Sequence, residues 1–154
     1  MRDVKPTETQ ATILLVEDDP GDQVLVQRTF EEGEIKTSLQ IVEDGVQALD
    51  YLLHRGEFVD PKSSPRPDLI LLDLNLPKLD GKQVLEKMRA HPDLRRIPVA
   101  VLTTSKREDD IVRSYDLGVN SYVTKSVDLD RFLDKLRVLT HYWFNIVVLP
   151  PSEE

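Results

Sequence analysis

The chain has 154 residues, and a content of 40% hydrophobic and 31% charged residues predicts one folded domain with a full-sized core. Its net charge of −8 argues against binding to the phosphate backbone of nucleic acids. It has no cysteine, which excludes disulfides, zinc–thiolate sites and thiol nucleophiles, and no apolar run approaches the roughly 20 residues that a membrane helix needs.

Short apolar runs alternate with amphipathic stretches along the chain and predict alternating strands and helices. In chain order, the predicted elements are strand 12–16, a helix from Pro20 to near Gly33, strand 38–42, helix 46–54, strand 68–72, helix 81–90, strand 99–102, helix 107–117, strand 121–123 and a last helix carrying the stripe Leu129, Phe132, Leu133, Leu136 and Leu139. Asp19 would cap the first helix, and Gly118 suits the C-terminus of the fourth. The stretch 55–68, rich in proline and serine, predicts a long surface loop.

This alternation predicts the α/β class, with a doubly wound, five-stranded parallel sheet and helices on both faces. The apolar run that ends at Leu72 has no polar alternation, which indicates a central strand buried on both faces. In open sheets of this kind, ligands bind beyond the carboxyl ends of the strands. The residues that follow each predicted strand are therefore the candidates for a functional site.

Polar residues follow four of the predicted strands. Glu17 and Asp18 follow the first strand, Asp73 the third and Thr103 the fourth, and Lys125 lies two residues beyond the fifth. Each alone has a plainer interpretation as a helix cap, a turn residue or a surface charge. Four strand ends that each supply a suitable group nevertheless favour a shared site at one edge of the sheet.

Three neighbouring carboxylates would raise one another's pKa unless a cation lay among them. Oxygen ligands without histidine or cysteine favour Mg²⁺, with Mn²⁺ as an alternative, and the backbone carbonyl of Asn75 could complete the set. One carboxylate would then be free to attack phosphorus. The metal, the Thr103 hydroxyl and the Lys125 ammonium would hold the phosphoryl oxygens.

The motifs ILLVEDD, DLILLDLNLPKLDG, VAVLTTS and GVNSYVTK occur in this order, and residues 12–140 resemble the receiver domain of bacterial response regulators. This is the CheY-like family, and CheY itself is a standard example of the flavodoxin-like strand order 2-1-3-4-5. The resemblance implies that Asp73 accepts a phosphoryl group from a histidine kinase, and that Asp18 is the more direct metal ligand of the acidic pair. The metal ligands it implies are Glu17, Asp18, Asp73 and Asn75. The phosphoryl-binding and switch residues it implies are Thr103, Tyr122 and Lys125.

One position departs from the family pattern. Ser126 follows Lys125, where the family usually has a proline preceded by a cis peptide bond. A cis bond before a residue other than proline costs about 2.5–4 kcal/mol, so we expect this loop to be either trans or strained. Either outcome bears on the placement of Lys125.

The long loop before the third strand and the phrases LTTS, LGVNSYV and DLDRF resemble the stand-alone regulators that partner cyanobacterial phytochromes. Residues 1–11 are expected to be a polar tail, and residues 141–154 an extension that begins with the apolar run HYWFNIVVLP. This run would either fold back on its own domain or bury itself against a second copy. Relatives in this subgroup form dimers through the corresponding face, which implies an isologous homodimer. The implied contact residues are Tyr142, Trp143 and Phe144.

The expected function is that of a single-domain, cytoplasmic response regulator that acts through protein contacts and is not itself classed as an enzyme. One alternative is a magnesium-dependent phosphohydrolase, but Asn75 stands where such enzymes tend to carry a proton-transferring acid. A flavin or nucleotide site is disfavoured, because the acidic loop EDDPGD would repel phosphate. A receiver-like module that is never phosphorylated is favoured only by Ser126.

Overall fold

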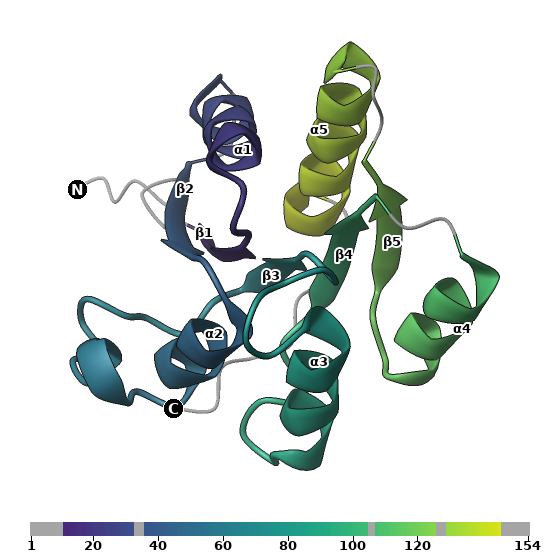
Figure 1. The fold of residues 1–154 in the computed structure, drawn as a ribbon. Coiled ribbons are helices and arrows are strands. Elements are labelled where there is room, and N and C mark those ends of the chain that lie inside the picture. Colours follow the sequence, from purple (N-terminus) through teal and green to yellow (C-terminus); the bar gives the residue numbers. More distant parts are fainter. Residues whose placement is uncertain (1–10, 33–35, 105–106, 126–128, 146–154) are drawn as a thin grey trace, which may run out of the picture.

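The computed structural model describes residues 11–32, 36–104, 107–125 and 129–145 (Figure 1). Its strands are β1 (Ala11–Val16), β2 (Thr37–Val42), β3 (Leu69–Leu72), β4 (Val99–Thr103) and β5 (Ser121–Thr124). Its helices are α1 (Pro20–Glu32), α2 (Gly45–Leu52), the 3₁₀ turn η2 (Gly56–Phe58), α3 (Gly81–Ala90), α4 (Glu108–Asp116) and α5 (Leu129–Asn145). Each predicted strand and helix is present, with ends that differ by a few residues.

The five strands are parallel and lie in the order β2-β1-β3-β4-β5. In Figure 1, α1 and α5 lie together on one side of the sheet, and α2 and α3 lie on the other. This confirms the predicted fold class and strand order. All carboxyl ends of the strands therefore meet at one edge.

Alternate residues of each central strand enter two separate hydrophobic cores. On β1, Ile13 and Leu15 face the core beneath α1 and α5, whereas Leu14 and Val16 face the core beneath α2 and α3. All four residues of β3 are buried, as predicted for a strand covered on both faces. Burying a leucine or isoleucine side chain contributes about 1.5–3 kcal/mol, so these strands provide a rigid base for the polar edge.

Polar caps fix where the helices begin. Asp19 Oδ1 accepts a hydrogen bond of 2.8 Å from the Gly21 N–H, which confirms Asp19 as the cap of α1. Asp80 starts α3 with a capping box, since its side chain accepts from the backbone of Gln83 and its own N–H donates to the Gln83 side chain. Gly118 follows α4 with φ +85°, a conformation that suits glycine after a helix.

The predicted loop 55–68 contains the short turn η2, and Tyr51 anchors the loop to the domain. The Tyr51 ring packs against Phe58 with centroids 5.4 Å apart, and its hydroxyl donates to the Pro65 carbonyl at 2.7 Å. Burial raises the pKa of Tyr51 to about 12. The loop is therefore packed at both its start and its end.

Helix α5 continues to Asn145, so the boundary predicted at residue 140 falls inside this helix. Leu136 and Leu139 of the predicted stripe are buried against the core beneath α1 and α5. Tyr142, Trp143 and Phe144 belong to α5, but their side chains lie outside what the structure describes. None of the described helices is long and apolar enough to cross a membrane.

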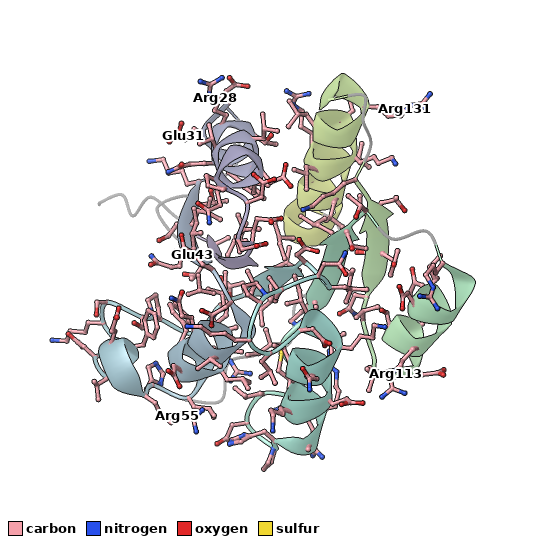
Figure 2. The ribbon with its side chains drawn as sticks, viewed as in Figure 1. Arg28, Glu31, Glu43, Arg55, Arg113 and Arg131 are labelled. Atoms are coloured by element: carbon pink, nitrogen blue, oxygen red, sulfur yellow. The ribbon has the colours of Figure 1, made fainter. Side chains whose placement is uncertain are left out.

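Charged side chains lie on the outer surfaces of these helices. Figure 2 shows Arg28 and Glu31 extending outward from α1, and Arg131 extending outward from α5. The acidic residues at the carboxyl edge differ from these, because two of them are buried.

Candidate functional site

The register of β1 and β3 brings the first two acids together. Val16 pairs with Leu72, so Glu17 and Asp73 leave neighbouring strands at the same level of the sheet. The Asp73 N–H donates to the Val16 carbonyl at 3.1 Å, and this bond continues the pairing of the strands up to the acid. The backbone pairing of β1 with β3 therefore places Glu17 and Asp73 next to each other, whatever conformation their side chains adopt.

Glu17, Asp18 and Asp73 form a compact cluster of carboxylates. One oxygen of each lies within 4.8 Å of the others. Glu17 is 2% exposed and Asp73 is 7% exposed, whereas Asp18 is open to solvent. Carboxylate oxygens at this spacing fit a hard cation such as Mg²⁺, and the exposed Asp18 leaves a path by which the ion can enter.

Burial raises the pKa of Glu17 to about 7, and the negative charge of Asp73 adds to this effect. The opposing contributions come from Lys125 and from the Asp19 N–H, which donates to Glu17 Oε2 at 3.0 Å. A buried carboxylate that is costly to ionise is the kind of group that a cation stabilises. The fit between this cluster and a divalent metal is therefore electrostatic as well as geometric.

Lys125 lies directly after β5 and reaches into the acidic cluster. Its Nζ donates to Glu17 Oε1 at 2.5 Å, to Asp22 Oδ2 at 2.8 Å and to Asp73 Oδ2 at 3.2 Å. Only 11% of the side chain is exposed. Its backbone N–H donates to the Thr103 carbonyl at 2.7 Å, which ties the lysine to the end of β4.

Burial alone would lower the pKa of Lys125, but its hydrogen bonds to Asp22 and Glu17 and the charges of Asp73 and Glu17 raise it on balance. The pKa shifts of Glu17 and Lys125 oppose each other, because an ionised Glu17 is one of the groups that keep the lysine charged. Asp22 and Asp73 resolve the conflict, since they stabilise the ammonium even when Glu17 is protonated. Lys125 is therefore a cation in this site.

Asn75 and Thr103 complete the edge. The Asn75 N–H donates to Asp73 Oδ1 at 3.0 Å, and its side-chain amide donates to Thr103 Oγ1 at 3.4 Å. Thr103 is fully buried. A Cβ on Gly81 would lie 2.5 Å from the Asp73 carbonyl oxygen, so glycine is required where α3 starts against this loop. These contacts hold the Asp73 carboxylate between β3 and β4.

The profile of the response regulator receiver domain matches residues 13–137. This chain belongs to that family. It is 48% identical to response regulator Rcp1 of Synechocystis sp. over 140 residues, which cover 91% of this chain and 93% of Rcp1. Both the recognised family and the resemblance to cyanobacterial phytochrome regulators are thereby confirmed.

Two solved structures show the same receiver architecture. The phosphorylated cyanobacterial phytochrome response regulator RcpA is 43% identical with a TM-score of 0.87, over 93% of this chain and 100% of RcpA. The Mn²⁺-bound form of Rcp1 is 47% identical with a TM-score of 0.85, over 92% of this chain and 99% of that structure. The likeness therefore extends over nearly the whole of each chain.

Tyr122 lies on β5, three residues before Lys125. It pairs with Val101 in the β4–β5 register and is half-buried against the core beneath α2 and α3. Its position agrees with the family's switch aromatic, but its role stays a prediction. Ser126, the departure from the family pattern, lies outside the described residues.

Asp22 is the site residue that sequence analysis missed. It lies in the first turn of α1, three residues after the cap Asp19, and its Oδ2 lies 2.8 Å from Lys125 Nζ. The sequence signal was the position of Asp22 three residues after the cap Asp19. An acid in the first turn of a helix that starts at the sheet edge points toward that edge. The sequence alone offered several acids there and no means of selecting this one.

Proposed function

We propose that this receiver is a single-domain response regulator that accepts a phosphoryl group on Asp73 from a histidine kinase, with Mg²⁺ bound. The observation that carries the proposal is the position of the Asp73 carboxylate, which lies between two further acids and the Lys125 ammonium. That arrangement offers a nucleophile, a site for a divalent cation and a fixed positive charge within one polar edge.

In the proposed transfer, an Asp73 carboxylate oxygen forms a bond to phosphorus as the bond from phosphorus to the kinase histidine nitrogen breaks. The imidazole leaves with the electron pair of the broken bond. Lys125 and the Thr103 hydroxyl would each donate to a phosphoryl oxygen, and Asn75 would orient the attacking carboxylate through its N–H. Mg²⁺, when held by Glu17, Asp18 and Asp73, would neutralise the charge that gathers on the phosphoryl oxygens.

The relatives support the metal and the modification. Rcp1 has been solved with Mn²⁺ bound, and RcpA has been solved phosphorylated. We infer Mg²⁺ as the ion used here, with Mn²⁺ as the alternative, because both accept carboxylate oxygens. The carbonyl of Asn75 remains the proposed fourth protein ligand.

We further infer that the partner is a phytochrome-type histidine kinase and that the protein acts in the cytoplasm. The test is phosphotransfer from an autophosphorylated phytochrome kinase, with intact mass as the readout and Asp73→Asn as the control. Transfer of one phosphoryl group to the wild type alone is the expected result. Transfer from unrelated histidine kinases at an equal rate would contradict the phytochrome assignment.

We expect Thr103 and Tyr122 to respond to phosphorylation. Thr103 lies at the end of β4, and Tyr122 lies on the neighbouring strand β5. The shallow apolar surface nearby is lined by Val123, Val138 and Leu139, and Val138 is 69% exposed. This surface supports a homodimer that also uses Tyr142, Trp143 and Phe144. Sedimentation of Val138→Glu, expected to be monomeric, tests that contact.

Slow hydrolysis of the acyl phosphate would return the protein to its starting state, without making it an enzyme acting on other molecules. Asn75 lies two residues after Asp73 and cannot serve as the general acid that a phosphohydrolase needs. Incubation with small phosphate esters should therefore give no more than one turnover per molecule. Many turnovers would favour the phosphohydrolase.

A further inference from the structure

The three N–H donors of the Lys125 ammonium are matched by three carboxylates. The contact to Asp22 is 2.8 Å, shorter than the 3.2 Å contact to the phosphoacceptor Asp73. Asp22 belongs to α1, whereas Asp73 follows β3. The lysine is thus held by the helix as closely as by the residue on which the chemistry is proposed to occur.

Asp22 differs from the other two acceptors because it lies outside the carboxylate cluster and is more exposed. Glu17 and Asp73 belong to the cluster whose spacing fits a cation, and Asp22 does not. The Asp22 side chain is 27% exposed, against 3% for Glu17 and 9% for Asp73. Because water can solvate Asp22 after its release, it is the acceptor that the ammonium can give up at the lowest cost.

A phosphoryl group on Asp73 would bring new anionic oxygens to the ammonium. With its donors already engaged, Lys125 can bind a phosphoryl oxygen only by releasing one of its present acceptors. The Asp73 contact changes with the modification itself, because its carboxylate becomes part of the acyl phosphate. Of the two acceptors that keep their charge, Asp22 is the more exposed, so it competes most directly with the phosphoryl oxygens for the ammonium. The contact of Lys125 with Asp22 and its contact with a phosphoryl oxygen are both charge-assisted hydrogen bonds, so they are of similar strength and compete for the ammonium.

We propose that Asp22 is a positioning residue that competes with the phosphoryl group for the Lys125 ammonium and so lowers the phosphorylated fraction of the protein. This inference rests on the proposed function, since it requires Asp73 to accept a phosphoryl group. Asp22 acts through the lysine and touches neither the donor nor the reacting atoms.

Asp22→Asn keeps the size of the side chain and removes its charge. The test measures the steady-state phosphorylated fraction by intact mass against acetyl phosphate concentration, at saturating Mg²⁺. In each event, an Asp73 oxygen bonds to phosphorus, the bond from phosphorus to the acetyl oxygen breaks, and acetate leaves with the electron pair. The half-saturating acetyl phosphate concentration should fall about fivefold, the typical difference between a charged and a neutral hydrogen bond.

Asp19→Asn is the matched control. It changes the net charge equally at the same edge, and asparagine still caps α1, but Asp19 does not bind Lys125 among the described contacts. Its half-saturating concentration should stay within about twofold of the wild type. A purely structural role for Asp22 in the first turn of α1 would act in the opposite direction, by lowering both the thermal midpoint and the phosphorylated fraction.

An unchanged or raised half-saturating concentration in Asp22→Asn, with wild-type protein that is phosphorylated, would overturn the competition. An equal fall in Asp19→Asn would overturn it as well, because net charge would then suffice. If the wild type gained no phosphoryl group at all, the proposed function itself would fail, and that outcome is read before either variant is compared.

Discussion

Two groups of ionic contacts in this molecule differ in the number of carboxylates that face each cation. At the carboxyl edge of the sheet, one ammonium, that of Lys125, faces three carboxylates. Between α3 and α4, cations and carboxylates meet in pairs: Lys82 lies 2.6 Å from Asp110, and Arg113, labelled in Figure 2, pairs with Glu86. The second group is balanced, and the first carries an excess of negative charge.

The difference separates structural contacts from a site prepared for ligands. The ion pairs of Lys82 with Asp110 and of Arg113 with Glu86 bring opposite charges together and join α3 to α4. The excess of carboxylates around Lys125 is costly without a further cation, and a bound Mg²⁺ would offset it. The same lysine can then exchange an acceptor for a phosphoryl oxygen. Imbalance of charge, rather than the number of ionic contacts, marks the functional edge.

Lys125→Met should give the largest effect on stability. It removes the counter-charge of two buried carboxylates, and the free energy of unfolding should fall by about 3 kcal/mol in Mg²⁺-free buffer, as for a broken buried pair. Mg²⁺ should restore part of the loss, because a cation can replace the ammonium. Urea unfolding with and without Mg²⁺ measures both. A loss that Mg²⁺ leaves unchanged would contradict the view that charge is in excess.

Asp18→Asn should weaken Mg²⁺ binding by about tenfold to 100-fold, the typical worth of one charged ligand contact. Stability should change little, because Asp18 is exposed. Calorimetric titration with Mg²⁺ provides the measurement. Asp19→Asn is the comparison, because Asp19 is also exposed but caps α1. This variant should keep most of the wild-type affinity for Mg²⁺. Equal weakening in both variants would indicate attraction by net charge alone.

Lys82→Met probes the balanced group. Its partner Asp110 is nearly buried, and the loss should be about 1 kcal/mol in unfolding free energy. Mg²⁺ should not restore this loss, in contrast to Lys125→Met. The same urea titrations decide the point. A loss equal to that of Lys125→Met would remove the distinction between the two groups.

Lys78→Gly separates backbone strain from charge in the loop that joins β3 to α3. Lys78 has φ +67°, a left-handed conformation that favours glycine, and its ion pair with Asp44 is long at 3.5 Å. The substitution should raise stability by about 0.5 kcal/mol. Lys87→Gly, inside α3, should lower it by about 1 kcal/mol. Destabilisation by both would show that the ion pair outweighs the strain.

The fold and most of the site could be predicted from the sequence because they depend on local patterns. Apolar runs defined the strands, and parallel strands end at one edge, so Glu17, Asp18 and Asp73 were expected together. Their spacing, one oxygen of each within 4.8 Å, agrees with that expectation. Thr103 and Lys125 were predicted at the same edge for the same reason.

The rest depends on tertiary detail that local patterns do not carry. The contact of Asp22 with Lys125 joins residues 103 positions apart and depends on the direction of one long, flexible side chain. The packing of Tyr51 on Phe58 within the predicted loop likewise depends on which apolar surfaces meet. No turn or period in the sequence specifies these partners.

Phosphorylation of Asp73 at the acidic edge is tested most directly by intact mass after incubation with acetyl phosphate, with and without Mg²⁺. We expect the wild type to gain one phosphoryl group only with Mg²⁺, and Asp73→Asn to gain none. Phosphorylation without Mg²⁺, or on Asp73→Asn, would contradict the assignment of the acidic edge. Absence of any gain in folded wild-type protein would contradict the phosphoacceptor role itself.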